Sequence, residues 1–281
     1  MIDGRPVAPE GAKVSVFDRG FLYGDSVFET LRTYGGRPFA LERHLARLAR
    51  SAARVFIELP VSIEQIGREV ESAVVGAGNA ESYVRVTLTR GVGEALGLDP
   101  GLSRHPLRVV IVTPLQAPAA TLYEHGVAVV TFHGARVTDD SSATGAKVGN
   151  YLTAVLASRQ MRAAGAAEAL LVDRRGCVVE GATSNVFAVL DDGTLVTPPE
   201  EDGILLGITR ETVLEVAAEL GLRCRLASLP LSDVKAAAEV FVCSSIRELL
   251  PVVSIDGSPV GRGRPGPITR QLLSAFRIKV Q

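Results

Sequence analysis

The order in which strand-like and helix-like runs follow one another is the feature of this sequence that most constrains its fold. Strands alternate apolar and polar residues, whereas amphipathic helices repeat about every 3.6 residues. Strands are predicted at residues 12–18, 26–34, 82–90, 107–113, 126–132, 168–173, 178–180, 185–190, 222–227 and 239–243. Helices are predicted at residues 41–56, 62–76, 149–164, 208–220 and 266–277. Because the two kinds do not alternate regularly, and no G-x-G-x-x-G follows a strand, the sequence predicts an α+β protein.

Three local signals support these boundaries. Gly35-Gly36 after the run 26–34 is typical of a β-hairpin turn. Ser62, followed three residues later by Gln65, is a capping box that opens a helix. Gly221 stands where a helix over 208–220 would end with a left-handed residue.

The chain is long enough for two compact domains. It has 281 residues, of which 47% are hydrophobic, so it can bury a large core. The stretch Pro114–Ala120 (PLQAPAA) is the best linker. We therefore expect a small N-terminal α+β domain over residues 1–116 and a larger C-terminal domain over 117–281, with a ligand cleft between them.

Charge and composition argue against several partners. Lysine plus arginine (30) nearly balance aspartate plus glutamate (31), which gives no basic surplus for nucleic acid or an anionic membrane. The first 20 residues lack an apolar signal-peptide core, and no run approaches the roughly 20 apolar residues of a membrane span. Three widely spaced cysteines form no disulfide framework, and four histidines show no metal-ligand spacing. We expect a cytoplasmic protein with reduced thiols and no metal site.

Lys147 is the most informative residue in the chain. It lies in Gly145-Ala-Lys147-Val-Gly-Asn-Tyr151, just before a predicted helix. Lysine is the side chain that forms a Schiff base with an aldehyde cofactor, and small neighbours would let a planar ring approach the backbone. Taken alone, the lysine is better explained as an ordinary surface residue at a helix start, because most lysines are exposed.

Three further motifs follow the same logic. Glu180, in EGATSN at the end of a predicted strand, could hold a pyridine nitrogen protonated, or it could belong to a polar turn. Thr209, in LGITR at a helix start, could donate to a phosphate together with free backbone amides, or it could be an ordinary cap. Arg47, among apolar helix positions, could bind phosphate oxygens, or it could be solvated.

The four motifs, in this order and spacing, resemble the class IV (fold type IV) pyridoxal 5′-phosphate (PLP)-dependent enzymes. These include branched-chain aminotransferases, D-amino-acid transaminases and aminodeoxychorismate lyases. The resemblance covers essentially the whole chain, from FDRGFLYGDSVFE at residues 17–29 to FVCSSIRELLPV at 241–252. It implies a two-domain fold of the D-amino-acid aminotransferase type with PLP in the interdomain cleft, and a homodimer whose pockets borrow a loop from the neighbour.

The resemblance also assigns roles to residues. Lys147 forms the Schiff base and is the catalytic residue, Tyr151 lies against the phenolic oxygen of the cofactor, and Glu180 pairs with the pyridine nitrogen. The remaining residues that it assigns to the cofactor are Arg47, Ser184, Asn185, Gly207, Ile208, Thr209, Ser244 and Ser245. Those that it assigns to the substrate are Tyr23, Phe28, Arg85, Arg90 and Ser245.

Three activities compete within the family. Ser82-Tyr-Val-Arg85 and the apolar Phe28 favour transamination of a branched or other aliphatic L-amino acid with a 2-oxo acid such as 2-oxoglutarate or pyruvate, which is our first prediction. Thr89-Arg90-Gly91 favours a D-amino-acid transaminase, in which an arginine at this position holds the substrate carboxylate, but Gly93 replaces the histidine of those enzymes. Phe28-Glu-Thr and the serine-rich loop before Arg247 also occur in 4-amino-4-deoxychorismate lyases. A non-catalytic binding module would lack the lysine or the carboxylate, and Lys147 and Glu180 are both present.

Overall fold

The computed structural model describes residues 1–134 and 141–281. The chain divides into two compact units. Unit 1 consists of Met1–Gln116 and Asp140–Asn150, and unit 2 consists of Ala117–Asp139 and Tyr151–Gln281. The segment that carries Lys147 therefore packs with the N-terminal part of the chain, although its sequence neighbours on both sides belong to unit 2.

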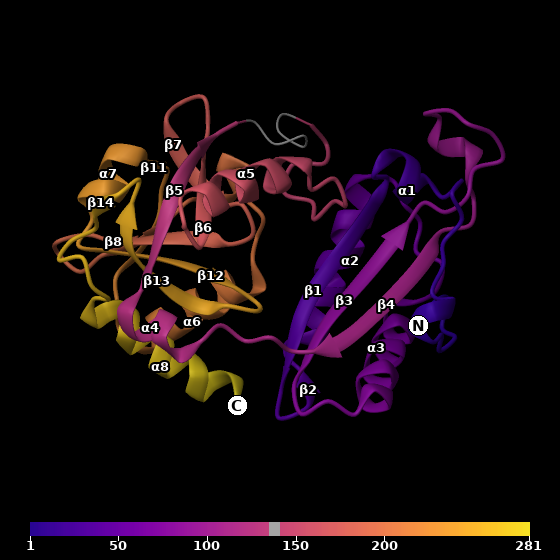
Figure 1. The fold of residues 1–281 in the computed structure, drawn as a ribbon, viewed down its shortest axis with the longest axis horizontal. Helices are drawn as coiled ribbons and strands as arrows, with labels where there is room; N and C mark the ends of the chain where they lie inside the picture. Colours follow the sequence, from indigo (N-terminus) through magenta and orange to yellow (C-terminus); the bar gives the residue numbers. More distant parts are fainter. Residues whose placement is uncertain (135–140) are drawn as a thin grey trace. The chain divides into compact units, whose positions relative to one another are not determined.

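Unit 1 is built on an antiparallel sheet with the strand order β2-β1-β3-β4 (Figure 1). Its strands are β1 (Ser26–Tyr34), β2 (Arg37–Pro38), β3 (Ser82–Thr89) and β4 (Leu107–Pro114). Gly35 and Gly36 both have positive φ, 58° and 74°, and form the predicted hairpin turn between β1 and β2. A side chain with a Cβ is strained in that region, so the two glycines allow the tight return.

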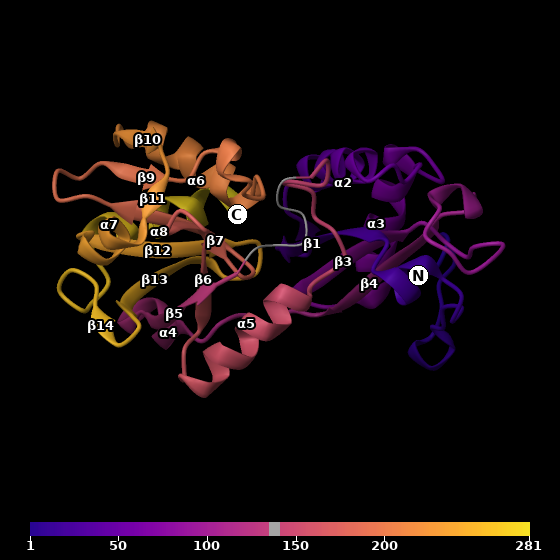
Figure 2. The same cartoon turned by 90° about the horizontal axis from the view of Figure 1, so that it is seen from above.

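Helices cover one side of this sheet (Figure 2). They are α2 (Leu41–Arg54) and α3 (Ile63–Ala77), and the shorter helical segments of the unit are η1 (Pro9–Gly11), α1 (Arg19–Tyr23) and η2 (Pro100–Leu102). The Ser62 hydroxyl accepts the Gln65 amide at 3.2 Å, which confirms the predicted cap of α3. Between helices and sheet lies a core of aliphatic residues such as Leu31, Leu48 and Val86.

Unit 2 contains a larger mixed sheet with the order β10-β9-β8-β12-β13-β5-β6-β7-β11, and β14 pairs with β13. Strand β5 runs parallel to both β13 and β6, β9 runs parallel to β10, and the other pairs are antiparallel. Its strands are β5 (Val127–His133), β6 (Glu168–Val172), β7 (Cys177–Gly181), β8 (Asn185–Val189), β9 (Leu195–Thr197), β10 (Cys224–Leu226), β11 (Leu229–Pro230), β12 (Glu239–Ser244), β13 (Glu248–Ile255) and β14 (Ser258–Pro259).

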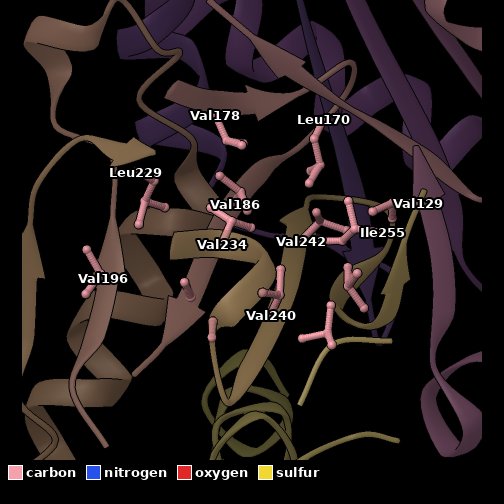
Figure 3. Packing of buried hydrophobic residues seen from close by; sticks show 14 of the residues in the cluster. Val129, Leu170, Val178, Val186, Val196, Leu229, Val234, Val240, Val242 and Ile255 are labelled. Atoms are coloured by element: carbon pink, nitrogen blue, oxygen red, sulfur yellow. The ribbon is translucent and has the colours of Figure 1, made fainter. Parts of the chain in front are cut away.

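Valines and leucines from many of these strands meet in one core (Figure 3). Around them lie α4 (Ala120–His125), α5 (Leu152–Ala163), η3 (Glu200–Asp202), α6 (Ile208–Glu219), α7 (Leu231–Ala236) and α8 (Pro267–Val280). The register brings several strand ends together, because Gly181 pairs with Leu170, Asn185 with Cys243, and Ser244 with Glu248. The end of β7, the start of β8 and the β12–β13 turn thus lie at one edge of the sheet.

One strand expected from the sequence is wrong, and one long strand was not predicted. Residues 12–18 do not form a strand: Val14 and Val16 are exposed, and no strand of the described chain pairs with them. The alternation in this segment therefore has no sheet to which it could contribute. Conversely, β13 was not predicted, because Pro251 lies in its middle and proline argues against a central strand. No helix in residues 1–134 and 141–281 is long and apolar enough to cross a bilayer.

Candidate active site

The residues singled out from the sequence divide between the two units. Six of them belong to unit 1, on its first helices and strands or in the segment before α5. They are Tyr23, Phe28, Arg47, Arg85, Arg90 and Lys147. Unit 2 carries the ones at the sheet edge and at two helix starts, which are Tyr151, Glu180, Ser184, Asn185, Gly207, Ile208, Thr209, Ser244 and Ser245. Each group is described within its own unit.

Arg47 is held by a buried carboxylate. Its Nε donates to Glu29 Oε1 at 2.7 Å and its Nη2 donates to Glu29 Oε2 at 2.8 Å. His44 lies one helical turn earlier on α2, and its Nδ1 is 2.7 Å from Glu29 Oε2. All three side chains are at most 6% exposed. The fork of Arg47 is therefore oriented by β1 as well as by its own helix.

The charges of this trio are set by burial and by the pairing. Burial opposes ionisation of the Glu29 carboxyl, but the charge of Arg47 and hydrogen bonds from Arg47 and His44 outweigh it and lower its pKa to about 2. Burial lowers the pKa of His44, more than the Glu29 carboxylate raises it. A neutral His44 beside an acceptor-only carboxylate carries its proton on Nδ1 and donates it to Glu29. The trio thus keeps one cation, Arg47, balanced by one anion.

The segment that carries Lys147 forms a short extra ladder with β1. The Phe28 amide donates to the Lys147 carbonyl at 3.0 Å, and the Gly149 amide donates to the Ser26 carbonyl at 2.7 Å. The Lys147 amide in turn donates to the Ser51 hydroxyl of α2 at 3.1 Å. These hydrogen bonds therefore fix the backbone of Lys147 between β1 and α2, whatever its side chain contacts.

The Phe28 ring has two cations near it. The guanidinium carbon of Arg85 is 3.8 Å from the ring centroid, and Lys147 Nζ is 4.7 Å from it. Cations are attracted to the face of an aromatic ring. Arg85 makes no ion pair with any residue in the described part of the chain. Unit 1 thus presents a guanidinium and an amine beside one buried apolar ring.

Arg90, in contrast, is occupied within unit 1. Its Nε and Nη2 donate to the two carboxylate oxygens of Asp25 at 2.7 and 3.0 Å. Its Nη1 donates to the Phe56 carbonyl at 2.6 Å, and its Nη2 also donates to the Val55 carbonyl at 2.7 Å. Burial raises the pKa of Asp25, but its bonds to Arg90 and Arg19 outweigh this and lower the pKa below its usual value.

Tyr23 lies at the end of α1, close to the same network. Its hydroxyl accepts the Gly97 amide at 3.2 Å, and its ring centroid lies 5.1 Å from the Arg19 guanidinium carbon.

In unit 2, the backbone of Leu205 links Glu180 and Asn185 just before the start of α6. Glu180 Oε2 accepts the Leu205 amide at 3.0 Å, and the Asn185 side-chain amide donates to the Leu205 carbonyl at 2.8 Å. Asn185 also lies against Gly207: a Cβ on this glycine would be 2.0 Å from Asn185 Oδ1. Asn185 therefore positions the helix start and requires a glycine at the position before α6.

The start of α6 has the chemistry of a phosphate site. Gly207 is the N-cap and has no side chain to make a cap bond, so the first amides, of Ile208 and Thr209, have no acceptor within the helix. The Thr209 hydroxyl makes no hydrogen bond to any described residue, although Thr209 is only 4% exposed. Free amides, a hydroxyl and the positive end of a helix dipole together suit an anion.

The remaining cofactor residues lie on turns and at a helix start. The Ser184 hydroxyl donates to Glu168 Oε2 at 2.8 Å. Ser244 and Ser245 lie at the β12–β13 turn, where the Ser244 hydroxyl accepts the Arg247 amide at 3.4 Å. Tyr151 is the N-cap of α5 and is 36% exposed.

Sequence reasoning missed four residues of this arrangement. Glu29 lies in the motif at residues 17–29 but received no role, and His44, Glu168 and Arg247 received none either. A glutamate among the apolar residues of a predicted strand was the available signal for Glu29. For Glu168 no local signal existed, since its partner Arg247 is 79 residues away in the chain.

The residues present fit PLP by their chemistry. The lysine needed for a Schiff base, a buried carboxylate for a pyridine nitrogen and unpaired amides at a helix start that suit a phosphate are all present. No group of histidine, cysteine or acidic side chains in the described residues could hold a metal ion. The three cysteines are free: Cys177 is partly buried, Cys224 is exposed and Cys243 is buried, and burial raises the pKa of Cys243 to about 12.

Comparisons with known proteins agree with this chemistry. The family model of amino-transferase class IV matches residues 26–255. A Methanocaldococcus jannaschii protein, provisionally named a branched-chain-amino-acid aminotransferase, is 38% identical over 98% of this chain and 94% of its own length. D-alanine aminotransferase of Staphylococcus aureus is 34% identical over 98% of this chain and 95% of its own length.

The fold agrees as well. The structure of Escherichia coli branched-chain amino acid aminotransferase matches with a TM-score of 0.90 and 32% identity, and covers 98% of this chain and 92% of that one. Another solved branched-chain amino acid aminotransferase, with pyridoxamine 5′-phosphate bound, matches with a TM-score of 0.91 and 32% identity over 98% of this chain and 91% of its own. The predicted α+β fold of type IV is therefore confirmed. The chain belongs to the class IV aminotransferases, a PLP-dependent family whose chemistry the lysine, carboxylate and phosphate site described above are suited to perform.

Proposed function

We propose that this enzyme transfers the amino group of a branched-chain or other aliphatic L-amino acid to a 2-oxo acid. The observation that carries the proposal is the different state of two arginines in unit 1. Arg90, the residue that would hold the carboxylate of a D-amino acid, is engaged by Asp25 and two carbonyls. Arg85 makes no ion pair with a described residue and lies on Phe28 beside Lys147.

This arrangement suits two substrates that use one pocket in turn. The buried Phe28 ring, 2% exposed, makes the surroundings of Lys147 apolar, which suits a donor with an aliphatic side chain. The Arg85 guanidinium can pair with a carboxylate at the far end of an acidic 2-oxo acid such as 2-oxoglutarate. A related structure, of a branched-chain amino acid aminotransferase that is 32% identical to this chain, contains N-(5′-phosphopyridoxyl)-L-glutamate, which supports an acidic partner substrate of this kind.

The proposed roles of the residues follow from their chemistry. Bound PLP supplies an electron sink for the carbanion formed at the substrate α-carbon. Lys147 binds the cofactor, removes the α-proton and returns it as general acid. Glu180 holds a proton on the pyridine nitrogen, with Leu205 fixing the carboxylate. The α6 amides, the Thr209 hydroxyl and Arg47 bind the phosphate, and Ser184, Asn185, Ser244, Ser245 and Tyr151 complete the cofactor site.

An amino-donor panel tests the proposal. The holoenzyme is mixed with L-leucine, L-valine, D-alanine or D-glutamate, and the absorbance change of the cofactor is followed in the half-reaction. We expect conversion with L-leucine and L-valine, and a return of the original spectrum that is faster with 2-oxoglutarate than with pyruvate. Conversion by the D-amino acids alone would overturn the proposal. Cleavage of aminodeoxychorismate without any 2-oxo acid would overturn the transamination itself while leaving the cofactor assignment in place.

Transamination of a D-amino acid is the second candidate. Thr89-Arg90-Gly91 and the 34% identity to D-alanine aminotransferase favour it. It requires Arg90 to exchange at least one of its present partners for a substrate carboxylate. The same panel distinguishes the two candidates, because D-alanine and L-leucine are tested side by side.

We further propose that the enzyme works as a homodimer in the cytoplasm. The expectation comes from the family resemblance and from the three free thiols. Light scattering coupled to size-exclusion chromatography measures the mass in solution, and a monomer of 29.6 kDa would contradict the dimer.

A further inference from the structure

Glu168, a residue without a role in the family resemblance, is a buried carboxylate at the sheet edge of unit 2 whose two oxygens both accept hydrogen bonds. It is fully buried, at 0% exposure. Its Oε2 accepts the hydroxyls of Thr183 at 2.9 Å and Ser184 at 2.8 Å, and it also accepts Arg247 Nη1 at 2.8 Å. Its Oε1 accepts the Ala169 amide at 2.9 Å. A buried carboxylate is stable only when its oxygens are satisfied in this way.

The partners of Glu168 lie on two different turns. Thr183 and Ser184 belong to the turn between β7 and β8, which closely follows Glu180. Arg247 belongs to the turn between β12 and β13, which carries Ser244 and Ser245. The two turns are also joined directly, because Arg247 Nη2 donates to the Thr183 hydroxyl at 3.0 Å.

The backbone of the first turn is shaped around this carboxylate. The Gly181 amide donates to the Ser184 carbonyl at 2.7 Å and closes the turn. A Cβ on Gly181 would be 2.2 Å from the Ser184 hydroxyl and 3.1 Å from Glu168 Cγ. Only a glycine lets the carboxylate approach this closely, so the turn, the hydroxyls and Glu168 form one unit.

We propose that Glu168 is a positioning residue for the cofactor, which holds the 183–184 turn and the 244–247 turn at a fixed separation through Thr183, Ser184 and Arg247. This rests on the proposed assignment of Ser184, Ser244 and Ser245 to the cofactor site. Glu168 touches neither cofactor nor substrate in this account. It acts on the cofactor indirectly, by fixing the positions of the Thr183 and Ser184 hydroxyls and of the backbone of both turns. Arg247, which is 25% exposed, is the partner of Glu168 that lies closer to solvent.

The experiment measures PLP binding by the apo protein, using equilibrium dialysis and visible absorbance, in three variants. Glu168→Gln keeps the volume but removes the charge that Arg247 and both hydroxyls need. Thr183→Val removes one hydroxyl from an exposed side chain, so it leaves folding intact and decides the matter if Glu168→Gln does not fold. Arg247→Lys keeps a cation for Glu168 but loses the second hydrogen bond of the guanidinium, the one to the Thr183 hydroxyl. We expect Glu168→Gln to weaken PLP binding about tenfold or more, the scale of a lost hydrogen bond to a charged group, and the other two to weaken it less.

Unit 2 contains a matched control. Glu239 is also a buried carboxylate, and it accepts the Thr269 hydroxyl at 2.7 Å and the amides of Ile268 and Thr269, but it lies at the opposite end of β12 from Ser244. Glu239→Gln is expected to lower the melting temperature and to leave PLP affinity unchanged. The double variant Glu168→Gln with Thr183→Val should lose less PLP-binding free energy than the sum of the two single losses, because both changes act through one carboxylate.

Three results have distinct meanings. A loss of affinity confined to the Glu168, Thr183 and Arg247 variants, with rescue of part of the affinity by Arg247→Lys relative to Arg247→Met, supports the proposal. If Thr183→Val and Glu168→Gln bind PLP as the wild type does while Ser245→Ala binds it more weakly, Glu168 serves the fold alone and the proposal fails. If Ser245→Ala and Ser184→Ala also bind PLP normally, the site assignment itself fails, and the positioning role fails with it.

Discussion

Arg47 and Glu29 form a bidentate pair in which both carboxylate oxygens of the strand residue accept from the helix residue, at 2.7 and 2.8 Å. The arginine chosen from the sequence as a phosphate ligand thus has a permanent internal anion. Its direction is fixed before any ligand binds, which reduces the entropy lost on binding. The pair also makes the stability of unit 1 depend on pH.

Acid should destabilise the apo protein through this trio. The pKa of Glu29 in the folded state, about 2, is lower than its ordinary 4.5, and the pKa of His44 is lowered from 6.5. Both groups therefore bind more protons in the unfolded state, and their contribution is present above these ordinary values and is lost as the pH falls. For Glu29 the shift corresponds to about 3 kcal/mol, lost between pH 4.5 and 2. Urea unfolding from pH 8 to pH 3 should show this slope, and Glu29→Gln should show a shallower one. An identical slope in the variant would contradict the assignment.

Replacing Lys147 by alanine should abolish transamination together with the visible absorbance of the lysine-bound cofactor. The backbone of Lys147 is held by Phe28 and Ser51, so the variant should fold normally. Absorbance spectra and single-turnover assays measure the two losses, and Lys13→Ala, at an exposed position, is the control. Turnover at the wild-type rate in Lys147→Ala would sink the assignment.

Glu180→Gln separates two roles of one carboxylate. The glutamine can still accept the Leu205 amide through its carbonyl, so the start of α6 should stay in place. It has no charge with which to hold a proton on the pyridine nitrogen, so kcat should fall about 100-fold, the scale of a lost electrostatic contact at a reacting group. Steady-state kinetics and thermal unfolding together measure this. A large loss of stability with little change in kcat would mean that the residue serves the fold instead.

Arg85 and Arg90 of unit 1 should respond differently when each is replaced by glutamine. Arg90→Gln leaves the partly buried Asp25 with Arg19 as its cation, and the lost charged hydrogen bonds should destabilise the protein by about 1.5–3 kcal/mol while the donor preference stays the same. Arg85→Gln should leave stability nearly unchanged and raise KM for 2-oxoglutarate more than KM for L-leucine. Unfolding curves and substrate-resolved kinetics provide the comparison. Loss of D-amino-acid turnover in Arg90→Gln would instead favour the second candidate function.

Gly207→Ala should weaken PLP binding, because its Cβ would be 2.0 Å from Asn185 Oδ1 and would displace the start of α6. Gly76→Ala is the matched change in a helix, since a Cβ there meets nothing within 4 Å. It should raise stability by roughly 0.5–1 kcal/mol and leave PLP affinity as it is. Equal PLP affinity in both variants would show that Asn185 and Gly207 do not need their present spacing.

Local signals predicted much of the fold. The strand β1, the cap of α3 at Ser62 and the start of α6 depend on residues close in sequence, and each appears where the sequence placed it. The segment 12–18 was mispredicted because alternation does not reveal whether a neighbouring strand exists. Strand β13 was hidden by Pro251, which the sheet accommodates opposite Phe241.

The site was predictable as a set of residue types, but its internal support was not. Lys147, Glu180 and Arg47 could be singled out because their chemistry is rare in such motifs. Glu29 and Glu168 act through partners that the sheet brings near them, and only the three-dimensional register reveals those partners. Likewise, nothing in Thr89-Arg90-Gly91 indicates that Asp25 and the carbonyls of Val55 and Phe56 already occupy the arginine.

The backbone of Leu205, which donates its N–H to Glu180 and accepts the Asn185 side-chain amide at its carbonyl, has a consequence for the selection of the cofactor. It fixes the separation between the Glu180 carboxylate and the start of α6, because only Leu206 lies between Leu205 and Gly207. An analogue of PLP with one more methylene between ring and phosphate would still carry the pyridine nitrogen and the phosphate. We expect it to bind more weakly than PLP, because the distance between these two groups would no longer match the distance between Glu180 and the start of α6. Inserting one residue after Leu206 should shift that preference toward the longer molecule.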